Sequence, residues 1–427
     1  RAKDKAGNWS AFQIVTAEIS TMPVVINEVA WAGTGLQTSS DEWIELYNRT
    51  NYDIDLSGWR LYSSDAGPDI IFGNDSGNRT TINKIIPANG YYLIERTKDD
   101  AVNNIPADWY GSFTNGLNNN GEILTLSHAS TTIDQTILCG MGSTQWCPGF
   151  DYKYRTMERM NLDMAGTEPT NWSYNNPLIR NGKTATDEDI SGTPKARNSV
   201  DYLIVKTGSN ITSDLTLKKS KSPYIVDNTG ITVNAGITLT IEPGVVIKFY
   251  NDAGMGVFGK IIAQGTADEP VVFTSFNDDV YGGDLDATST TPAAGSWYGI
   301  DIVSGNSIFD NAIFRYGGKW YNGVGNSMAN LSIKDASAAI TNSIFEYSKV
   351  YGLKLTNSNS TVSGSIFRNN NYLGEGGATG MLVEAGSEVL IQSSSFSDNR
   401  TGIYYSNSPI KLENVRFENN VWGVSAD

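Results

Sequence analysis

The chain has 427 residues, of which 46 are acidic and 31 are Lys or Arg, and its formal net charge is -15. At roughly 150 residues per domain, this length predicts two or three domains. An acidic surface repels phosphate backbones, so we expect no nucleic-acid partner. We expect no membrane insertion of this chain either, because it has no run of about 18 apolar residues. Many Gly, Tyr and Trp residues and only 18% charged residues favour an all-β protein.

The two ends of the sequence predict a fragment of a longer chain. The segment RAKDKAGNWS (1–10) resembles the closing strand of a fibronectin type III or immunoglobulin-like domain. We therefore interpret residues 1–22 as the end of such a domain followed by a linker. The final VWGVSAD reads as a strand whose edge no polar or proline-bearing segment covers, so we expect more chain after it.

Cys139 and Cys147 are the two cysteines, and a turn-forming GMGSTQW lies between them. A disulfide, two free thiols and a metal site are the alternatives. Zinc normally takes four Cys or His ligands, and the only histidine, His128, is isolated in the sequence, so a metal site is disfavoured. We favour a local disulfide over free thiols, because the other features of the sequence indicate a location outside the cell.

Residues 23–198 alternate between apolar and polar side chains at period two, in short segments separated by turn signals. This pattern predicts an antiparallel β-sandwich. We expect its core to include Trp43, Leu46, Trp59 and Leu61. The segments are VVINEVAW (24–31), DEWIELYN (41–48), IDLSGWRLY (54–62), GYYLIE (90–95) and GEILTL (121–126).

One of these segments carries an acidic cluster, Asp41, Glu42 and Glu45. A metal site is one interpretation of it. Solvation of an exposed edge strand is the one we favour.

The same segments resemble the lamin tail domain. The resemblance rests on INEVAW (26–31), DEWIELYN (41–48), IDLSGWRL (54–61), TMER (156–159) with NW (171–172), and GTPKARN (192–198). It implies an immunoglobulin-like sandwich over residues 23–198 with no common catalytic residues. Bacterial members of this family accompany nucleases, hydrolases or surface architecture, so the resemblance implies an adaptor in a secreted protein rather than an activity.

After residue 199 the sequence repeats. Five segments share a small residue, a phenylalanine, a polar turn and a second strand, and the phenylalanines follow one another at separations of 31, 22, 29 and 21 residues: Phe314, Phe345, Phe367, Phe396 and Phe417. A repeat of 21 to 22 residues cannot bury its own apolar face, so it must stack on its neighbours. The repeat predicts a β-helical solenoid over residues 199–427.

Two columns of residues follow from aligning these phenylalanines. One position later, the charges alternate in Arg315, Glu346, Arg368, Ser397 and Glu418. Three positions later come Gly317, Ser348, Asn370, Asn399 and Asn420. Stacked coils would place opposite charges side by side and would let the asparagines form an amide ladder.

The segments ITVNAGITLTIEPGVVIKF (231–249) and GKIIAQGTADEPVVFTS (259–275) resemble the entry coils of right-handed parallel β-helix proteins, particularly large secreted bacterial ones. Right-handedness also agrees with the crossover rule for parallel strands. This architecture is found in polysaccharide lyases, glycosidases, adhesins and autotransporter passengers, so it indicates a fold and not a function.

The segment FNDDVYGGDLDATS (276–289) is an acidic excursion between two coils. Gly282 and Gly283 permit tight bends, and calcium prefers carboxylate and carbonyl oxygens. A calcium site and a solvated acidic loop are both open. The candidate ligands are Asp278, Asp279, Asp284 and Asp286.

The sequence contains no convincing set of catalytic residues. His128 falls in the sandwich, where we expect it at an exposed strand end, so the solenoid has no histidine for a catalytic triad. A pectate-lyase-like site would need an arginine base beside a calcium cluster. None of the candidate arginines, Arg315, Arg368, Arg400 and Arg416, is close to the acidic loop in sequence. We name no catalytic residue.

Aromatic residues that follow the repeat phenylalanines, Tyr351, Tyr372 and Trp422, are candidates for stacking on sugar rings. Packing against the insertions or against the sandwich is the alternative that we favour. The sequence thus predicts an extracellular or cell-surface structural or adhesion module without catalytic activity, whose partner is a glycan, a cell surface or another copy. A secreted polysaccharide lyase or glycoside hydrolase, with its cleft on the β-helix wall, is the alternative.

Overall fold

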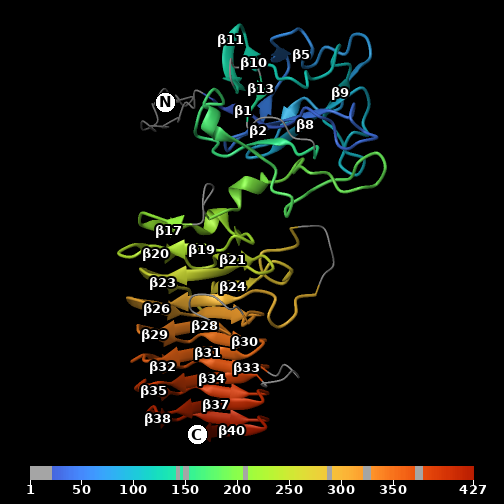
Figure 1. Ribbon diagram of the computed structural model, residues 1–427. Helices are drawn as coiled ribbons and strands as arrows, with labels where there is room; N and C mark the ends of the chain where they lie inside the picture. The colour runs from blue at the N-terminus through green and yellow to red at the C-terminus, as the bar shows by residue number, and fades with distance from the viewer. Residues whose placement is uncertain are drawn as a thin grey trace, which may run out of the picture. The chain divides into compact units, whose positions relative to one another are not determined.

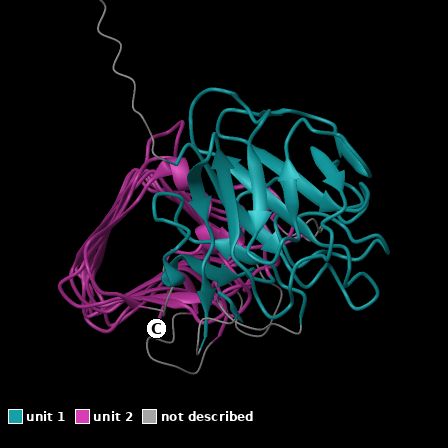
Figure 2. Cartoon of the chain, turned by 90° about the horizontal axis from the view of Figure 1, so that it is seen from above, with its two compact units in different colours: residues 1–177, 181–198 teal, residues 178–180, 199–427 magenta. Residues whose placement is uncertain are grey.

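The computed structural model describes residues 22–140, 145–147, 153–204, 210–285, 291–320, 328–370 and 378–427. It divides into two compact units, the first up to residue 177 with 181–198, and the second 178–180 with 199–427 (Figures 1 and 2). The predicted end of a preceding domain lies, except for Met22, outside the described residues. In the described ranges, no helix is long and apolar enough to cross a bilayer.

The first unit is a β-sandwich. A seven-stranded sheet has the order β15-β14-β1-β2-β8-β9-β6, and a four-stranded sheet has the order β11-β10-β4-β5. Neighbouring strands are antiparallel except β8 and β9, which are parallel. The strands of the larger sheet are β1 (Val24–Ala30), β2 (Trp43–Asn48), β6 (Arg79–Thr81), β8 (Tyr91–Arg96), β9 (Trp109–Gly111), β14 (Met157–Arg159) and β15 (Trp172–Tyr174).

The smaller sheet consists of β4 (Arg60–Ser63), β5 (Asp69–Ile71), β10 (Leu124–His128) and β11 (Thr131–Gln135). Two short ribbons complete the unit, β3 (Ile54–Asp55) with β7 (Ile85–Ile86), and β12 (Leu138–Cys139) with β13 (Gln145–Trp146). Single 3₁₀ turns lie at η1 (Pro169–Asn171), η2 (Ser199–Asp201) and η3 (Lys219–Lys221), the last two in the second unit.

The four predicted core residues of the sandwich are buried. Leu46, Trp59 and Leu61 belong to its main apolar cluster. Trp43 packs in a smaller cluster that includes Leu93, because successive residues of β2 point to opposite faces of the sheet. The larger sheet therefore has buried side chains on both faces.

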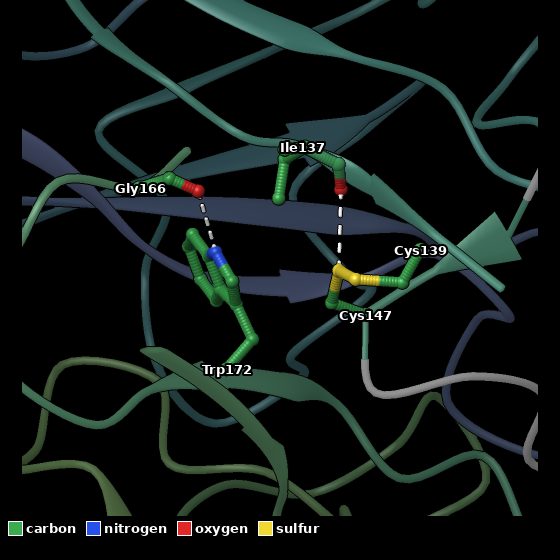
Figure 3. The surroundings of a disulfide bond; sticks show 5 residues. All are labelled: Ile137, Cys139, Cys147, Gly166 and Trp172. Carbon is green, nitrogen blue, oxygen red and sulfur yellow. Dashed lines mark hydrogen bonds between the residues drawn. A yellow bond between two sulfur atoms is a disulfide. The ribbon is translucent and has the colours of Figure 1, made fainter. Parts of the chain in front are cut away.

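A disulfide joins Cys139 in β12 to Cys147, which directly follows β13 (Figure 3). Their Cα atoms are 5.1 Å apart, and Cys147 is fully buried. The Cys147 sulfur lies 3.5 Å from the Ile137 carbonyl oxygen. This is a contact rather than a hydrogen bond, because a disulfide sulfur carries no proton. The disulfide closes the ribbon of β12 and β13.

The second unit is a parallel β-helix whose coils each add one strand to three sheets (Figure 1). Seen along the stack, successive coils superpose (Figure 2). The first sheet contains β16 (Asn210–Ile211), β19 (Ile231–Val233), β22 (Gly254–Val257), β25 (Gly299–Ile302), β28 (Ala329–Lys334), β31 (Tyr351–Thr356), β34 (Thr379–Glu384), β37 (Thr401–Ser406) and β40 (Trp422–Ala426).

The second sheet contains β17 (Leu215–Leu217), β20 (Thr238–Ile241), β23 (Lys260–Gln264), β26 (Asn306–Asp310), β29 (Ser337–Thr341), β32 (Thr361–Ser363), β35 (Val389–Gln392) and β38 (Ile410–Glu413). The third contains β18 (Tyr224–Val226), β21 (Val246–Phe249), β24 (Val271–Ser275), β27 (Ala312–Arg315), β30 (Ile344–Glu346), β33 (Ile366–Arg368), β36 (Ser395–Ser397) and β39 (Arg416–Glu418).

The repeat phenylalanines form a stacked column inside the β-helix, as their spacing predicts. Phe314 and Phe345 have ring centroids 4.8 Å apart and nearly parallel planes. The column starts one coil earlier than the repeat indicated, at Phe273, which stacks on Phe314 at 4.8 Å. The separation between rings matches the distance between strands of one sheet, so the coils stack without a shift in register.

The predicted asparagine ladder is present. The Asn370 side chain donates to the Asn399 Oδ1 at 3.0 Å, and Asn399 donates to the Asn420 Oδ1 at 2.9 Å. Alignment of the repeats on their phenylalanines did not identify one member, Asn330, whose Oδ1 accepts a hydrogen bond from the Gly317 backbone N–H at 2.7 Å. Asn330 comes from the first sheet of the next coil, so its carboxamide completes the ladder where the repeat has Gly and Ser.

The predicted charge column is also present. Glu346 pairs with Arg315 at 3.2 Å and with Arg368 at 2.8 Å, so one carboxylate bridges the arginines of the coils on either side. Arg315 and Glu346 are both buried, although they project from the outer face of the third sheet. Something therefore covers that face at these coils.

Each corner of the later coils has a residue with left-handed backbone, with φ between 47° and 63°. Asn, Asp and Gly adopt this conformation at the lowest cost, which explains their frequency at the turns. The three corner columns are Asp335, Asn357, Ala385 and Asn407; Asn311, Asn342, Gly364, Ser393 and Asn414; and Tyr316, Tyr347, Asn369, Asp398 and Asn419.

Candidate functional site

A groove with a volume of about 450 Å³ lies on the outer face of the first sheet of the β-helix. Its floor comes from three neighbouring coils, where Thr232 of β19, Gly256 of β22 and Asp301 of β25 are in register. Alternate residues of these strands point into the core, so the residues between them face the groove. The fold thus places two polar side chains on either side of a glycine.

Aromatic and apolar side chains border this floor. Phe258 is 42% exposed, and Tyr298, directly before β25, also lines the groove. The Lys319 amine lies 5.9 Å from the centre of the Tyr298 ring and pairs with the Asp252 carboxylate. Flat apolar surface beside a few fixed polar groups is the usual composition of a small-molecule binding site.

Asp301 is the electrostatically unusual residue of the groove. Burial raises the pKa of its carboxyl group to about 7, although a hydrogen bond from Ser332 and the charge of Lys354 act in the opposite direction. Its Oδ1 atom has no hydrogen-bond partner among the described residues. An unsatisfied buried oxygen in a groove is a place where a ligand hydroxyl can bind.

The same outward column continues past the groove through Ser332 and Lys354. The Lys354 amine pairs with the Glu384 carboxylate at 3.1 Å and lies 5.9 Å from the centre of the Tyr351 ring. The positive charge next to the groove is therefore already compensated by a carboxylate.

The predicted sugar-stacking residues lie away from this groove. Tyr351 and Trp422 belong to one column of the first sheet, but Thr379 and Thr401 lie between them. Trp422 is 53% exposed, whereas Tyr351 is half-buried. Tyr372 lies outside the described residues. The two described aromatics do not form one continuous platform, and their role in stacking stays a prediction.

The acidic loop folds over the outer face of the third sheet. Asp278 is buried, accepts a hydrogen bond from the Thr274 hydroxyl at 2.5 Å, and lies 3.5 Å from the Arg315 guanidinium. Gly282 and Gly283 both have φ near +75°, as expected for tight bends. The Gly283 carbonyl accepts a hydrogen bond from the buried Lys248 amine. This loop therefore covers the charge column of its sheet.

Of the four candidate calcium ligands, Asp286 lies outside the described residues. Asp278, Asp279 and Asp284 do not form a metal-binding group, and the described part of the chain contains no cluster of three His, Cys, Asp or Glu residues placed to hold an ion. Calcium binding by this loop stays a prediction.

Arg315 lies beside the acidic loop, which separation along the chain had not indicated. Burial lowers its pKa, but the neighbouring carboxylates of Asp278 and Glu346 more than compensate and keep the pKa above the ordinary value of arginine. The rings of Tyr281, Tyr316 and Tyr347 lie 4.7 to 5.5 Å from its guanidinium carbon. A permanently charged, enclosed arginine cannot act as a base.

The interpretation of the Glu42 and Glu45 cluster as an exposed edge is wrong. Both side chains are buried, because other segments pack over them: the Leu117 N–H donates to Glu42 and the Lys195 N–H donates to Glu45. Their strand, β2, also lies between β1 and β8 and is not an edge. Burial raises the pKa of Glu42 to about 7 and that of Glu45 to about 8. Period-two alternation identified the strand but not its position in the sheet.

Glu45 belongs to a network of buried glutamates that holds the segment closing the sandwich. Glu28 accepts a hydrogen bond from the Thr193 N–H at 2.9 Å, and the single hydroxyl proton of Thr193 lies within reach of both Glu28 at 2.9 Å and Glu158 at 3.1 Å. The Lys195 N–H donates to Glu45 at 2.5 Å. These contacts explain the GTPKARN motif structurally.

His128 lies at the exposed end of β10, as predicted, and stacks on Trp59 with ring centroids 5.1 Å apart.

Comparison with known families agrees with both units. A model described as "Lamin Tail Domain" matches residues 18–138, "Pectate-lyase like beta helix domain" matches 209–326, and "Right handed beta helix region" matches 294–426. The chain joins a lamin tail domain to a right-handed β-helix. All residues that line the groove fall within the pectate-lyase-like match.

A relative of the chain is "Protein bark beetle" from Drosophila melanogaster, 36% identical over 94 residues, which are 22% of this chain and 3% of that protein. The chain thus spans a small fraction of this relative. No solved structure matches the chain. The family descriptions favour a surface or polysaccharide-related role and do not separate binding from cleavage.

Proposed function

We propose that this chain is a non-catalytic module of an extracellular or cell-surface protein and that it binds glycan chains through the groove on its β-helix. The observation that carries the proposal is the floor of the groove, where the Asp301 Oδ1 atom is buried without a partner in the described structure, next to Tyr298 and Phe258. Sugars present hydroxyl groups at their edges and apolar C–H faces, and this groove offers complements to both.

Binding without cleavage is supported by the carboxylates of the groove. Glycoside hydrolysis normally uses two carboxyl groups, one as an acid and one as a base or nucleophile. Asp252 and Asp301 are the only two among the described lining residues, and Asp252 is paired with Lys319. A lyase needs a base, and the nearest candidate from the sequence, Arg315, is enclosed on another sheet.

The location outside the cell is supported by the disulfide. Structural disulfides persist mainly in oxidising compartments. Cell-surface contact and self-association remain part of the proposal, because the β-helix presents long outer walls. A purely architectural subunit would assemble in a concentration-dependent way and would bind no glycan.

A glycan array followed by calorimetric titration tests the proposal. We expect selective binding of one glycan class, a weaker affinity for it in Asp301→Asn, and no release of reducing ends or unsaturated products during long incubation. The absence of binding to any glycan would contradict the proposal. Turnover of any polysaccharide would contradict its non-catalytic part.

A glycoside hydrolase is the second candidate, and the pKa of Asp301 favours it. A carboxyl group with a pKa of about 7 is half-protonated at neutral pH and is suited to donate a proton to a leaving group. In that case Asp301→Asn would abolish turnover while leaving binding largely intact. If the unaltered chain shows no turnover and Asp301→Asn weakens binding, the result supports the binding module.

A further inference from the structure

Gly256 stands in the middle of strand β22 without a conformational need for glycine. Its φ is not in the left-handed region. A Cβ atom built on it would lie 3.8 Å from the Thr232 Oγ1 and 3.9 Å from the Phe258 ring, which are ordinary contact distances. At Gly259, by comparison, a Cβ would lie 2.1 Å from the Ile237 carbonyl oxygen. The backbone and the packing therefore both accept a side chain at position 256.

Glycine is unfavourable inside a strand, because it orders a flexible backbone and packs no side chain. A glycine that the fold does not require usually marks a close approach of something else. Here it keeps the floor of the groove low between Thr232 and Asp301, which flank it in the coils on either side. A larger residue at this position would fill the space between these two polar groups.

The charge of the groove restricts what can occupy that space. Among the described residues, those that line it include Asp252 and Asp301 but no Lys or Arg. The cations nearby are compensated, since Lys319 pairs with Asp252 and Lys354 pairs with Glu384. A carboxylate on a ligand would be repelled by the Asp301 carboxylate, and the two nearby cations that could offset this repulsion are already paired with Asp252 and Glu384. A sugar hydroxyl, in contrast, can donate to the carboxylate oxygen.

We infer that the groove seats an uncharged sugar ring over Gly256, with Asp301 as its hydrogen-bond partner, and that it discriminates against uronates. This inference rests on the proposed glycan binding and names the ligand class. It differs from what the match to a pectate-lyase-like model suggests, because pectate is a polymer of charged sugars.

A matched pair of ligands tests the charge rule. Oligogalacturonates and their fully methyl-esterified forms share one backbone and differ in the carboxylate, and a neutral galactan oligomer completes the panel. In calorimetric titrations, we expect the esterified and neutral chains to bind at least about tenfold more tightly than the acid form. Asp301→Asn should narrow that difference. Equal or tighter binding of the acid form would overturn the inference.

Gly256→Val tests whether the sugar ring lies over Gly256, with Gly256→Ala as the milder variant. We expect the melting temperature to stay the same or rise and the affinity for the neutral chain to fall at least about tenfold. Ser425→Val is the matched control, since Ser425 belongs to the same outward column in the last coil, and it should leave affinity unchanged. If folded Gly256→Val binds the neutral chain with unchanged affinity, the proposed position of the sugar over Gly256 is wrong. If no sugar binds the unaltered chain, the proposed function itself is overturned.

Discussion

The Arg315 guanidinium lies 3.5 Å from the Asp278 carboxylate, and this ion pair fixes the acidic loop on the wall of the β-helix. The pair forms because Thr274, four residues before Asp278, belongs to β24, and β24 pairs with the Arg315 strand β27 in the next coil. Stacking of coils thus brings together charges that are far apart along the chain.

Asp278→Ala should destabilise the β-helix by about 3 kcal/mol, since removing one partner leaves a buried charge only partly compensated. Arg315 would keep Glu346, so we expect a loss and not complete unfolding. Denaturant titration of the full chain measures the change. Asp268→Ala is the control, because Asp268 is an exposed carboxylate of the same unit, and it should have little effect. A loss of similar size in both variants would contradict the role of the pair.

The lamin tail domain should lose stability as the pH rises. Burial raises the pKa of Glu45, Glu95 and Glu122 to about 8 from an ordinary value of 4.5, and it also raises the pKa of Glu28 well above that ordinary value. The folded state therefore holds protons that the unfolded state releases. Their stabilising contribution is full below about pH 4.5 and is lost progressively as the pH approaches about 8.

Thermal unfolding between pH 5 and pH 9 measures this slope, and hydrogen exchange of β1 and β2 assigns it to the correct unit. Glu45→Gln should flatten the slope. Glu188→Gln, at an exposed position of the same unit, should not change it. A stability that rises across this pH interval would contradict the protonated state of the buried glutamates.

The amide ladder should contribute more in its interior than at its end. Asn399→Ala removes a donor to the Phe367 carbonyl and an acceptor for the Asn370 N–H, so we expect a loss of about 3 kcal/mol. Asn420 lies in the last coil and is less buried, and Asn420→Ala should cost about half as much. Denaturant midpoints of the two variants give the comparison, and equal losses would show that the ladder is not cooperative.

Ala385 is an alanine in a corner column of Asn and Asp residues, with φ of 55° and an exposed side chain. Asparagine tolerates this conformation better, so Ala385→Asn should stabilise the β-helix by about 0.5 to 1 kcal/mol. Ala385→Val should do the reverse, since a β-branched residue is strained there. Melting temperatures that move in the same direction for both variants would contradict the explanation.

Chelation tests the calcium prediction for the acidic loop. If Asp279, Asp284 and Asp286 hold a calcium ion, EDTA should lower the melting temperature of the β-helix, and Asp279→Ala should remove that sensitivity. The Asp278 carboxylate is already engaged with Thr274 and Arg315. An unchanged melting temperature on chelation would contradict calcium binding by this loop.

The fold could be predicted because its signals repeat. Phenylalanine and asparagine recur at the spacing of one coil, as at Phe345 and Asn399. Stacking of the coils turns this spacing into straight columns of equal side chains. The groove could not be predicted in this way. Thr232, Gly256 and Asp301 are unevenly spaced in the sequence and have no residue type in common. A glycine that the backbone does not require becomes visible only when its surroundings are known.

The two wrong expectations concern Glu45 and Arg315, and both arise because the sequence does not show which segments are neighbours in space. Alternation of polar and apolar residues showed that 43–48 is a strand, but it did not show that β2 is internal to its sheet or that the distant Lys195 segment covers Glu45. For Arg315, distance along the chain was a poor guide to distance in space, because every coil returns to the same wall.

The three long connections of the β-helix leave from one corner. They run from the third sheet to the first, between β24 and β25, β27 and β28, and β33 and β34, and the phenylalanine column continues across the last two without a change of register. Insertions and deletions at this corner can therefore change the surroundings of the first sheet while the scaffold stays the same. Related chains could acquire new ligands by replacing these connections alone, and an engineer could do so as well.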